Sequence, residues 1–113
     1  YITRESPTSY LGTLAPSSIV KTDDAYFLYY TAIDDLGLSH IGLLTSDDAS
    51  TWTDFNSSVF DPSVDGWDSG GIQNASVWYS SQVWEMFYTG LDADGEPAGI
   101  GYATSLDGLE WTR

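Results

Sequence analysis

The sequence predicts an all-β protein made of two antiparallel four-stranded blades of the propeller type. Three observations lead to this fold class. Apolar and polar residues alternate over short segments, no segment has the period of a helix, and the second half of the chain repeats the first. Four antiparallel strands that recur every ~50 residues are typical of propeller blades.

The internal repeat appears when Tyr30-Thr31 is aligned with Tyr88-Thr89, an offset of 88 − 30 = 58 residues. Beyond Gly95 the offset becomes 59, which aligns Trp52 with Trp111. One inserted residue in a turn explains the change, because insertions are tolerated in loops. We therefore expect a single all-β unit over residues 1–113, with repeat one at about 1–58 and repeat two at about 59–113.

Each repeat contains three segments with strand character, joined by polar turns. The strands are expected at 17–22, 25–32 and 39–46 in repeat one, and at 75–80, 83–90 and 98–105 in repeat two. The loops at 34–37 and 92–95 are rich in Asp and end in Gly, which is the composition of hairpin turns.

The strand at 83–90 is apolar on both of its faces. Trp84, Met86 and Tyr88 share one face, and the intervening Glu85, Phe87 and Thr89 share the other. Strands that are apolar on both faces are typical of sheets covered on both sides, so we expect each sheet to be covered in this way.

A fourth strand is expected to run from Trp52 to Phe60, where Asp61-Pro62 ends it. Repeat two is expected to lack this strand because the chain stops soon after Trp111. Tyr1-Ile2 lies one repeat before residues 59–60 and is expected to form such a strand at the start of the chain.

Two blades do not close a ring, since each end exposes a sheet edge and an apolar face. Two arrangements remain open. Three chains would give six blades, with residues 1–4 of one chain completing the second blade of the next. Alternatively, the chain is part of a longer one that carries further blades.

The charge is strongly acidic, with 17 Asp and Glu against three Lys and Arg, and a net charge of −14. Such a chain repels phosphate backbones and anionic lipid, so we expect neither nucleic acid nor membrane partners. The acidic residues are scattered, which indicates a solvated acidic surface, as in secreted or halophilic proteins. The absence of Cys and the lone His40 lead us to expect no metal site and no cofactor.

Two motifs of repeat two resemble a known family. Residues 84–90 read WEMFYTG, residues 99–111 read GIGYATSLDGLEW, and residues 68–77 read DSGGIQNASV. They are similar to blades of the five-bladed β-propeller glycoside hydrolases, the invertase, levansucrase and arabinanase relatives. With the repeat included, the resemblance covers about residues 12–113.

The resemblance implies sugar hydrolysis or transfer in a central pocket, by carboxylates on the inner strands. The chain departs from the family pattern, because its one Asp-Pro pair, Asp61-Pro62, follows Phe60 at the end of an outer strand. Neither inner strand begins with a carboxylate. No catalytic residue is therefore carried over from the family, and we expect the chain to lack complete catalytic machinery by itself.

The candidate ligand-binding residues lie in the loops before the inner strands. They are Trp67, Asp68, Gln73 and Asn74 in repeat two, and Tyr10 in repeat one. A Trp beside amide and carboxylate groups suits a sugar, which stacks on the ring and bonds through its hydroxyls. Asp68 is the first carboxylate to test for catalysis.

Other polar residues have structural interpretations. Asp48 and Asp107 lie in matching turns and are expected to accept hydrogen bonds from loop N–H groups. Asp92 and its acidic neighbours are expected to form a solvated hairpin tip, and His40 a rim residue.

Three functions are compatible with these residues. The first is a carbohydrate-related module that binds sugar or acts as scaffold. The second is an active glycoside hydrolase whose site is built from further blades or subunits. The third is a ring-forming structural repeat without a ligand.

Overall fold

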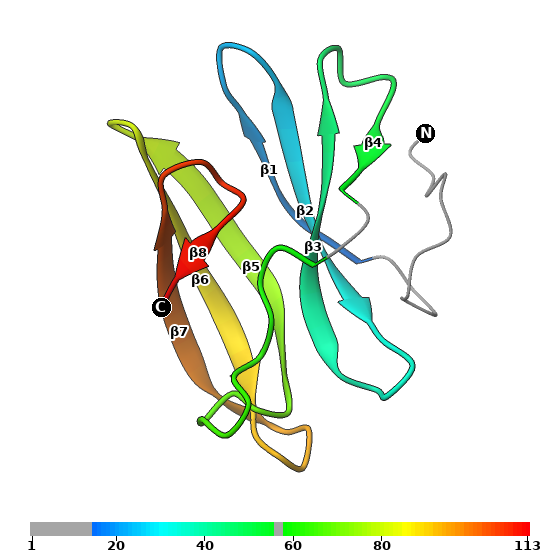
Figure 1. The fold of residues 1–113 in the computed structure, drawn as a ribbon, viewed down its shortest axis with the longest axis vertical. Coiled ribbons are helices and arrows are strands. Elements are labelled where there is room, and N and C mark those ends of the chain that lie inside the picture. Colours follow the sequence, from blue (N-terminus) through cyan, green and yellow to red (C-terminus); the bar gives the residue numbers. More distant parts are fainter. Residues whose placement is uncertain (1–14, 56–57) are drawn as a thin grey trace.

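The computed structural model describes residues 15–55 and 58–113, and within these ranges it contains eight strands and no helix. The strands form two antiparallel four-stranded sheets, with the orders β1-β2-β3-β4 and β5-β6-β7-β8 (Figure 1). This confirms the predicted all-β fold class. In the described part of the chain there is accordingly no helix long and apolar enough to cross a membrane.

Each sheet is a simple meander in which consecutive strands pair. The first sheet contains β1 (Ala15–Lys21), β2 (Tyr26–Ile33), β3 (Ser39–Ser46) and β4 (Thr53–Asp54). The second contains β5 (Gly71–Ser80), β6 (Val83–Leu91), β7 (Pro97–Ser105) and β8 (Trp111–Thr112). The first three strands of each sheet overlap the predicted segments, with ends that differ by a few residues.

The fourth strands differ from the prediction. In the first sheet, β4 pairs with Leu44 and Thr45, and Phe60 makes a separate bridge to Ile41, so the expected continuous strand is divided. The expected absence of a fourth strand from repeat two was wrong, because β8 pairs with β7. Trp111 supports this short strand by packing edge-on against Tyr29, with ring centroids 6.0 Å apart. The strand expected at Tyr1-Ile2 lies outside the described residues.

Aspartate side chains shape the turns as predicted. Oδ1 of Asp34 accepts hydrogen bonds from the N–H groups of Leu36 and Leu38, both at 2.9 Å. Asp92 accepts equivalent bonds in the second sheet. Asp48 and Asp107 each accept two backbone N–H bonds of 2.8 to 2.9 Å from the residues that follow them. The same bonds hold the pKa of both carboxyl groups below its ordinary value.

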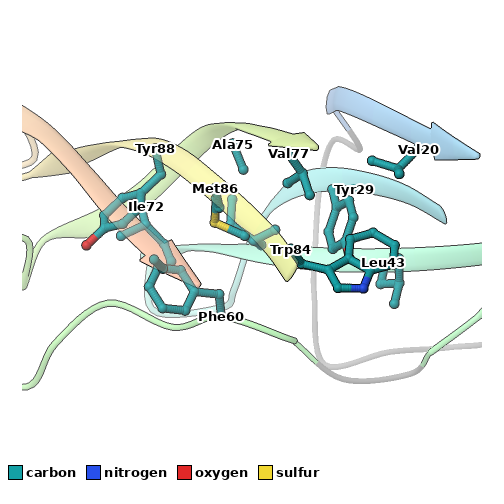
Figure 2. Close-up of a cluster of buried hydrophobic side chains, with 12 residues drawn as sticks. Val20, Tyr29, Leu43, Phe60, Ile72, Ala75, Val77, Trp84, Met86 and Tyr88 are labelled. Atoms are coloured by element: carbon teal, nitrogen blue, oxygen red, sulfur yellow. The ribbon is translucent and has the colours of Figure 1, made fainter. Parts of the chain in front are cut away.

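The main core lies between the two sheets (Figure 2). The first sheet contributes one face of β2 and β3, and the second contributes the face of β6 that carries Trp84, Met86 and Tyr88. Twelve buried residues form this cluster: Val20, Tyr29, Ile41, Leu43, Phe60, Ile72, Ala75, Val77, Trp84, Met86, Tyr88 and Ala103.

Hydrogen bonds cross the gap between the sheets. The Tyr29 hydroxyl donates to the Gly108 carbonyl at 2.7 Å, and burial raises the pKa of this phenol well above its ordinary value. The Val77 N–H donates to Ser18 Oγ at 3.2 Å, and the Asn74 N–H donates to Thr31 Oγ1 at 3.0 Å. These bonds satisfy polar groups that packing would otherwise leave unpaired, so they fix how the sheets are placed on each other.

The expectation that both sheets are covered on both faces holds for part of the first sheet only, because its second face is buried at Tyr30 and Leu44 but only half-buried at Tyr26 and Leu28. Tyr29 and Tyr30 point to opposite faces of β2, and both are buried. In the second sheet the face that points away from the core is open, with Phe87 46% and Ile100 78% exposed. The alternation of apolar residues identifies both faces of β6 as apolar, but it does not show which face has a partner.

Met86→Ala should strongly destabilise the fold. Met86 is fully buried between the sheets, and removing its side chain leaves a cavity. We expect the free energy of unfolding to fall by about 2–5 kcal/mol in urea titrations followed by tryptophan fluorescence. Leu106→Ala is the matched control, because Leu106 is 84% exposed and its loss should change stability by less than about 0.5 kcal/mol. Equal losses in the two variants would contradict this assignment of the core.

Candidate functional site

The loop between the two sheets, residues 61–70, carries Trp67 and Asp68. Asp68 is completely buried, and its Oδ1 accepts hydrogen bonds from both the backbone N–H and the hydroxyl of Ser63. Its Oδ2 accepts from the Tyr88 hydroxyl at 3.1 Å and from Arg113 at 3.1 Å. The carboxylate therefore joins the loop, the core strand β6 and the residue that follows β8.

The surroundings of Asp68 favour its ionised form. Burial alone would raise the pKa of this carboxyl, but the Ser63 hydrogen bonds and the Arg113 guanidinium hold it below its ordinary value. The pKa of Tyr88 is raised, first by burial and then by the Asp68 charge. At neutral pH, Asp68 is an acceptor of hydrogen bonds, and a general acid would need the opposite shift.

Trp67 lies next to this group and is 46% exposed. Its ring stacks on Tyr88, with a centroid separation of 6.1 Å and an interplanar angle of 16°. It also rests on two glycines, since a Cβ at Gly90 would come within 2.4 Å of the Trp67 ring and one at Gly99 within 3.5 Å. The glycines let the indole lie flat against β6 and β7 while much of the residue stays open to solvent.

The other predicted residues are placed elsewhere. Gln73 pairs with Thr89, so its side chain belongs to the sheet face opposite the one that carries Tyr88. Asn74 is exposed in a bulge of β5, with a left-handed φ of 56°. The structure thus brings Trp67 and Asp68 together and places Gln73 and Asn74 away from them. Tyr10 lies outside the described residues. Their roles as ligand contacts stay predictions.

Arg113 is a member of this group that sequence reasoning did not identify. Besides Asp68, its Nη2 donates to the Asp61 carbonyl at 2.5 Å, and its guanidinium lies 4.4 Å from the centre of the Phe60 ring. A signal was present in the repeat, because Arg113 aligns with Asp54, 113 − 59 = 54. In the first sheet, Asp54 accepts a hydrogen bond of 3.3 Å from the hydroxyl of Tyr30. Tyr30 is the counterpart of Tyr88 in the repeat.

A second polar group surrounds His40. Its Nε2 lies 2.7 Å from Asp34 Oδ2, and its Nδ1 lies 2.8 Å from Asp61 Oδ1. The hydrogen bond to Asp61 raises the pKa of His40, and the bond to Asp34 adds to this, while burial acts in the opposite direction. Within the described residues, no group of three or more His, Cys, Asp or Glu residues could hold a metal ion.

Arg113→Ala should weaken the fold by leaving the buried Asp68 charge without its cation. We expect a loss of about 1–3 kcal/mol in the free energy of unfolding at pH 7, measured by urea titration. Arg113→Lys keeps the charge but not the paired geometry, so it should recover part of the loss. If Arg113→Ala were as stable as the parent chain, Asp68 would not depend on this cation.

His40 should make stability depend on pH above its ordinary pKa. Because folding raises the pKa of His40, its contribution is fully present below about pH 6.5 and is lost as the pH rises through the folded value. The parent chain should therefore be more stable in urea at pH 6 than at pH 8. His40→Gln should lack this difference, and an unchanged pH profile would show that His40 does not cause it.

The two sheets together match known glycoside hydrolase structures. No family model matches the sequence, and no curated protein matches it. A glycosyl hydrolase from Bacteroides ovatus has a TM-score of 0.75 at 22% identity, over 88% of this chain and 30% of its own. A structure from the GH130 family, in work on glycoside hydrolases that target β-1,2 mannosidic linkages in Candida mannan, has a TM-score of 0.74 at 22% identity, over 88% of this chain and 30% of its own.

A further glycoside hydrolase matches with a TM-score of 0.64 at 23% identity, over 83% of this chain and 26% of its own. The chain thus spans about 30% of the length of the first two structures. The GH130 fold is a five-bladed β-propeller. At these identities the likeness concerns the fold, and on that evidence the two sheets of this chain are two blades of an incomplete β-propeller.

Proposed function

We propose that this chain is a carbohydrate-related propeller module that binds a sugar at Trp67 or serves as scaffold for such a site. The observation that carries the proposal is the match in shape to the glycosyl hydrolase from Bacteroides ovatus, with a TM-score of 0.75 over 88% of this chain. The sequence motifs of the second blade support it independently, since they resemble blades of propeller glycosidases.

The chemistry around Trp67 is compatible with sugar binding. The half-exposed indole is held flat by Tyr88 and the two glycines, so it could accept the C–H face of a pyranose or furanose ring without first being ordered. Arg113 is 39% exposed and bonds to the neighbouring Asp68, and it could donate to sugar hydroxyls. An aromatic platform with a few polar groups beside it is the usual composition of a small-ligand site.

Binding is favoured over hydrolysis by the state of Asp68. The carboxylate is buried, and its two oxygens already accept hydrogen bonds from Ser63, Tyr88 and Arg113. A catalytic carboxylate must reach the glycosidic bond as acid, base or nucleophile. On this proposal Asp68 holds the Trp67 loop in place, and the chain needs further carboxylates before it can hydrolyse a sugar.

Trp67→Ala should reduce sugar affinity. The parent chain would first be screened on a glycan array that includes β-1,2-mannosides, arabinan and fructan fragments, and the strongest ligand would then be titrated by calorimetry. We expect the variant to bind about tenfold more weakly, from the loss of ~1.4 kcal/mol of ring stacking. Phe55→Ala is the matched control, since Phe55 is 44% exposed and lies near the short edge strand β4.

Two results would contradict the proposal. If the parent chain bound no glycan, the binding form of the proposal would fail. If Phe55→Ala lost as much affinity as Trp67→Ala, the binding site would not be at Trp67. Hydrolysis of a glycan by the parent chain, lost in a folded Asp68→Asn variant, would instead identify an enzyme with Asp68 in its machinery.

A further inference from the structure

The second sheet has an exposed aromatic face, which points away from the core. We define this outer aromatic face by Trp78, Glu85, Phe87, Ile100 and Tyr102. Phe87, Ile100 and Tyr102 are 46%, 78% and 45% exposed. The rings of Trp78 and Tyr102 each lie 5.3 Å from the ring of Phe87, so the face is a continuous aromatic surface. Exposed apolar surfaces of this kind commonly mark sites of protein association.

The internal repeat shows what covers such a face within the chain. Phe87, Ile100 and Tyr102 align with Tyr29, Ile41 and Leu43 of the first sheet, all of which are fully buried. Those residues are covered by the opposite face of the second sheet, the one that carries Trp84 and Met86. The residues of the first sheet that align with Trp84 and Met86 are Tyr26 and Leu28. The two sheets therefore pack head to tail, with unlike faces in contact.

We propose that the outer aromatic face binds a second copy of this chain, through the first-sheet face that carries Lys21, Tyr26 and Leu28. The proposal goes beyond sugar binding and does not depend on it. In this arrangement the second copy repeats the contact that the two sheets already make inside one chain, over the end of the face that carries Lys21, Tyr26 and Leu28. Tyr30 and Leu44, further along the same face, are already buried within the chain. Each chain then uses its outer aromatic face toward one neighbour and its first-sheet face toward another.

Charge identifies a second copy as the occupant. Within the chain, Phe27 and Tyr79 line one hollow between the sheets. In the next contact along, the repeat replaces Phe27 by Glu85, 27 + 58 = 85, and Tyr79 by Lys21, 79 − 58 = 21. Lys21 of the second copy is thereby placed against Glu85. Both positions change together from an apolar pair to an opposite-charge pair, in a chain that has only three basic residues.

Two hydrogen bonds hold the Glu85 carboxylate where a cationic partner could reach it. The carboxylate accepts hydrogen bonds from the Trp78 indole at 2.6 Å and from the Tyr102 hydroxyl at 2.7 Å, so it is held in the middle of the aromatic surface. Covering a fixed carboxylate with apolar groups alone would be costly, because a buried charge needs a partner. The face that carries Lys21 provides one, with the Lys21 ammonium 5.7 Å from the centre of the Tyr26 ring.

The backbone contacts also continue. The Ser18 hydroxyl accepts the Val77 N–H across the gap between the sheets. Ser76 occupies the place of Ser18 on the outer aromatic face and is exposed there. The matching donor on a second copy is the N–H of Ile19, which aligns with Val77. Contacts that join unlike faces propagate, so repeated use of this interface generates a closed ring or an open array of chains.

The test is the solution mass of the full 113-residue chain as a function of concentration, by light scattering at about 0.15 M salt, where distant repulsion is screened. We expect a mass that is a multiple of 12.4 kDa and dissociates on dilution. Glu85→Lys and Lys21→Glu should each weaken association at least tenfold. The double variant, with the two charges exchanged, should associate again, because every interface regains an opposite-charge pair.

Glu96→Lys is the control for charge, since it makes the same reversal at an exposed hairpin tip and should associate like the parent chain. Circular dichroism of each variant checks that it is folded. A parent chain that has the mass of one copy at all concentrations would overturn the proposal. So would a Lys21→Glu variant that associates normally, as expected if outer aromatic faces pair with each other, or a double variant that fails to recover.

Discussion

The structure depends on the contact between unlike faces of two sheets that share one sequence pattern. Tyr29 and Leu43 of the first sheet meet Trp84 and Met86 of the second. Among the described residues, the core contains no helix. Burial of these large side chains is the main favourable term available to a chain whose outer strands β4 and β8 have two residues each. A single blade would leave this surface in water, so neither sheet can be considered separately from the other.

Both repeats contain the same local arrangement, a glycine beneath a tyrosine ring, and the two blades use it differently. Gly42 and Gly101 lie beneath the rings of Tyr30 and Tyr88, where a Cβ would approach within 2.3 Å and 2.2 Å of the ring atoms. Each tyrosine is thus pressed against its sheet, with its hydroxyl directed at a carboxylate. In the first blade that carboxylate is Asp54, on the edge strand. In the second blade, Arg113 holds the matching position, and the loop supplies Asp68 instead.

The acidic residues have several distinct roles. Asp34 and Asp92 cap hairpin turns, and in doing so they satisfy backbone donors at the ends of the strands. Asp34 also holds His40. Glu85 differs from these, because it accepts hydrogen bonds from aromatic side chains in the middle of an exposed apolar face. Its position places a charged residue within this exposed aromatic face, and the proposed contact with a second copy rests on that charge.

The sequence by itself determined the all-β class, the first three strands of each blade and the turns that join them, because these follow from short-range periodicity and turn chemistry. Tertiary structure alone decided that Trp84 and Met86 are buried while Phe87 is not, since alternation marks two faces without naming the partner of either. It also separated Gln73 from Trp67, which lie on opposite faces of one sheet. The ion pair of Arg113 with Asp68 joins residues that are 45 positions apart in the sequence. Short-range periodicity and turn chemistry predict no contact over that separation.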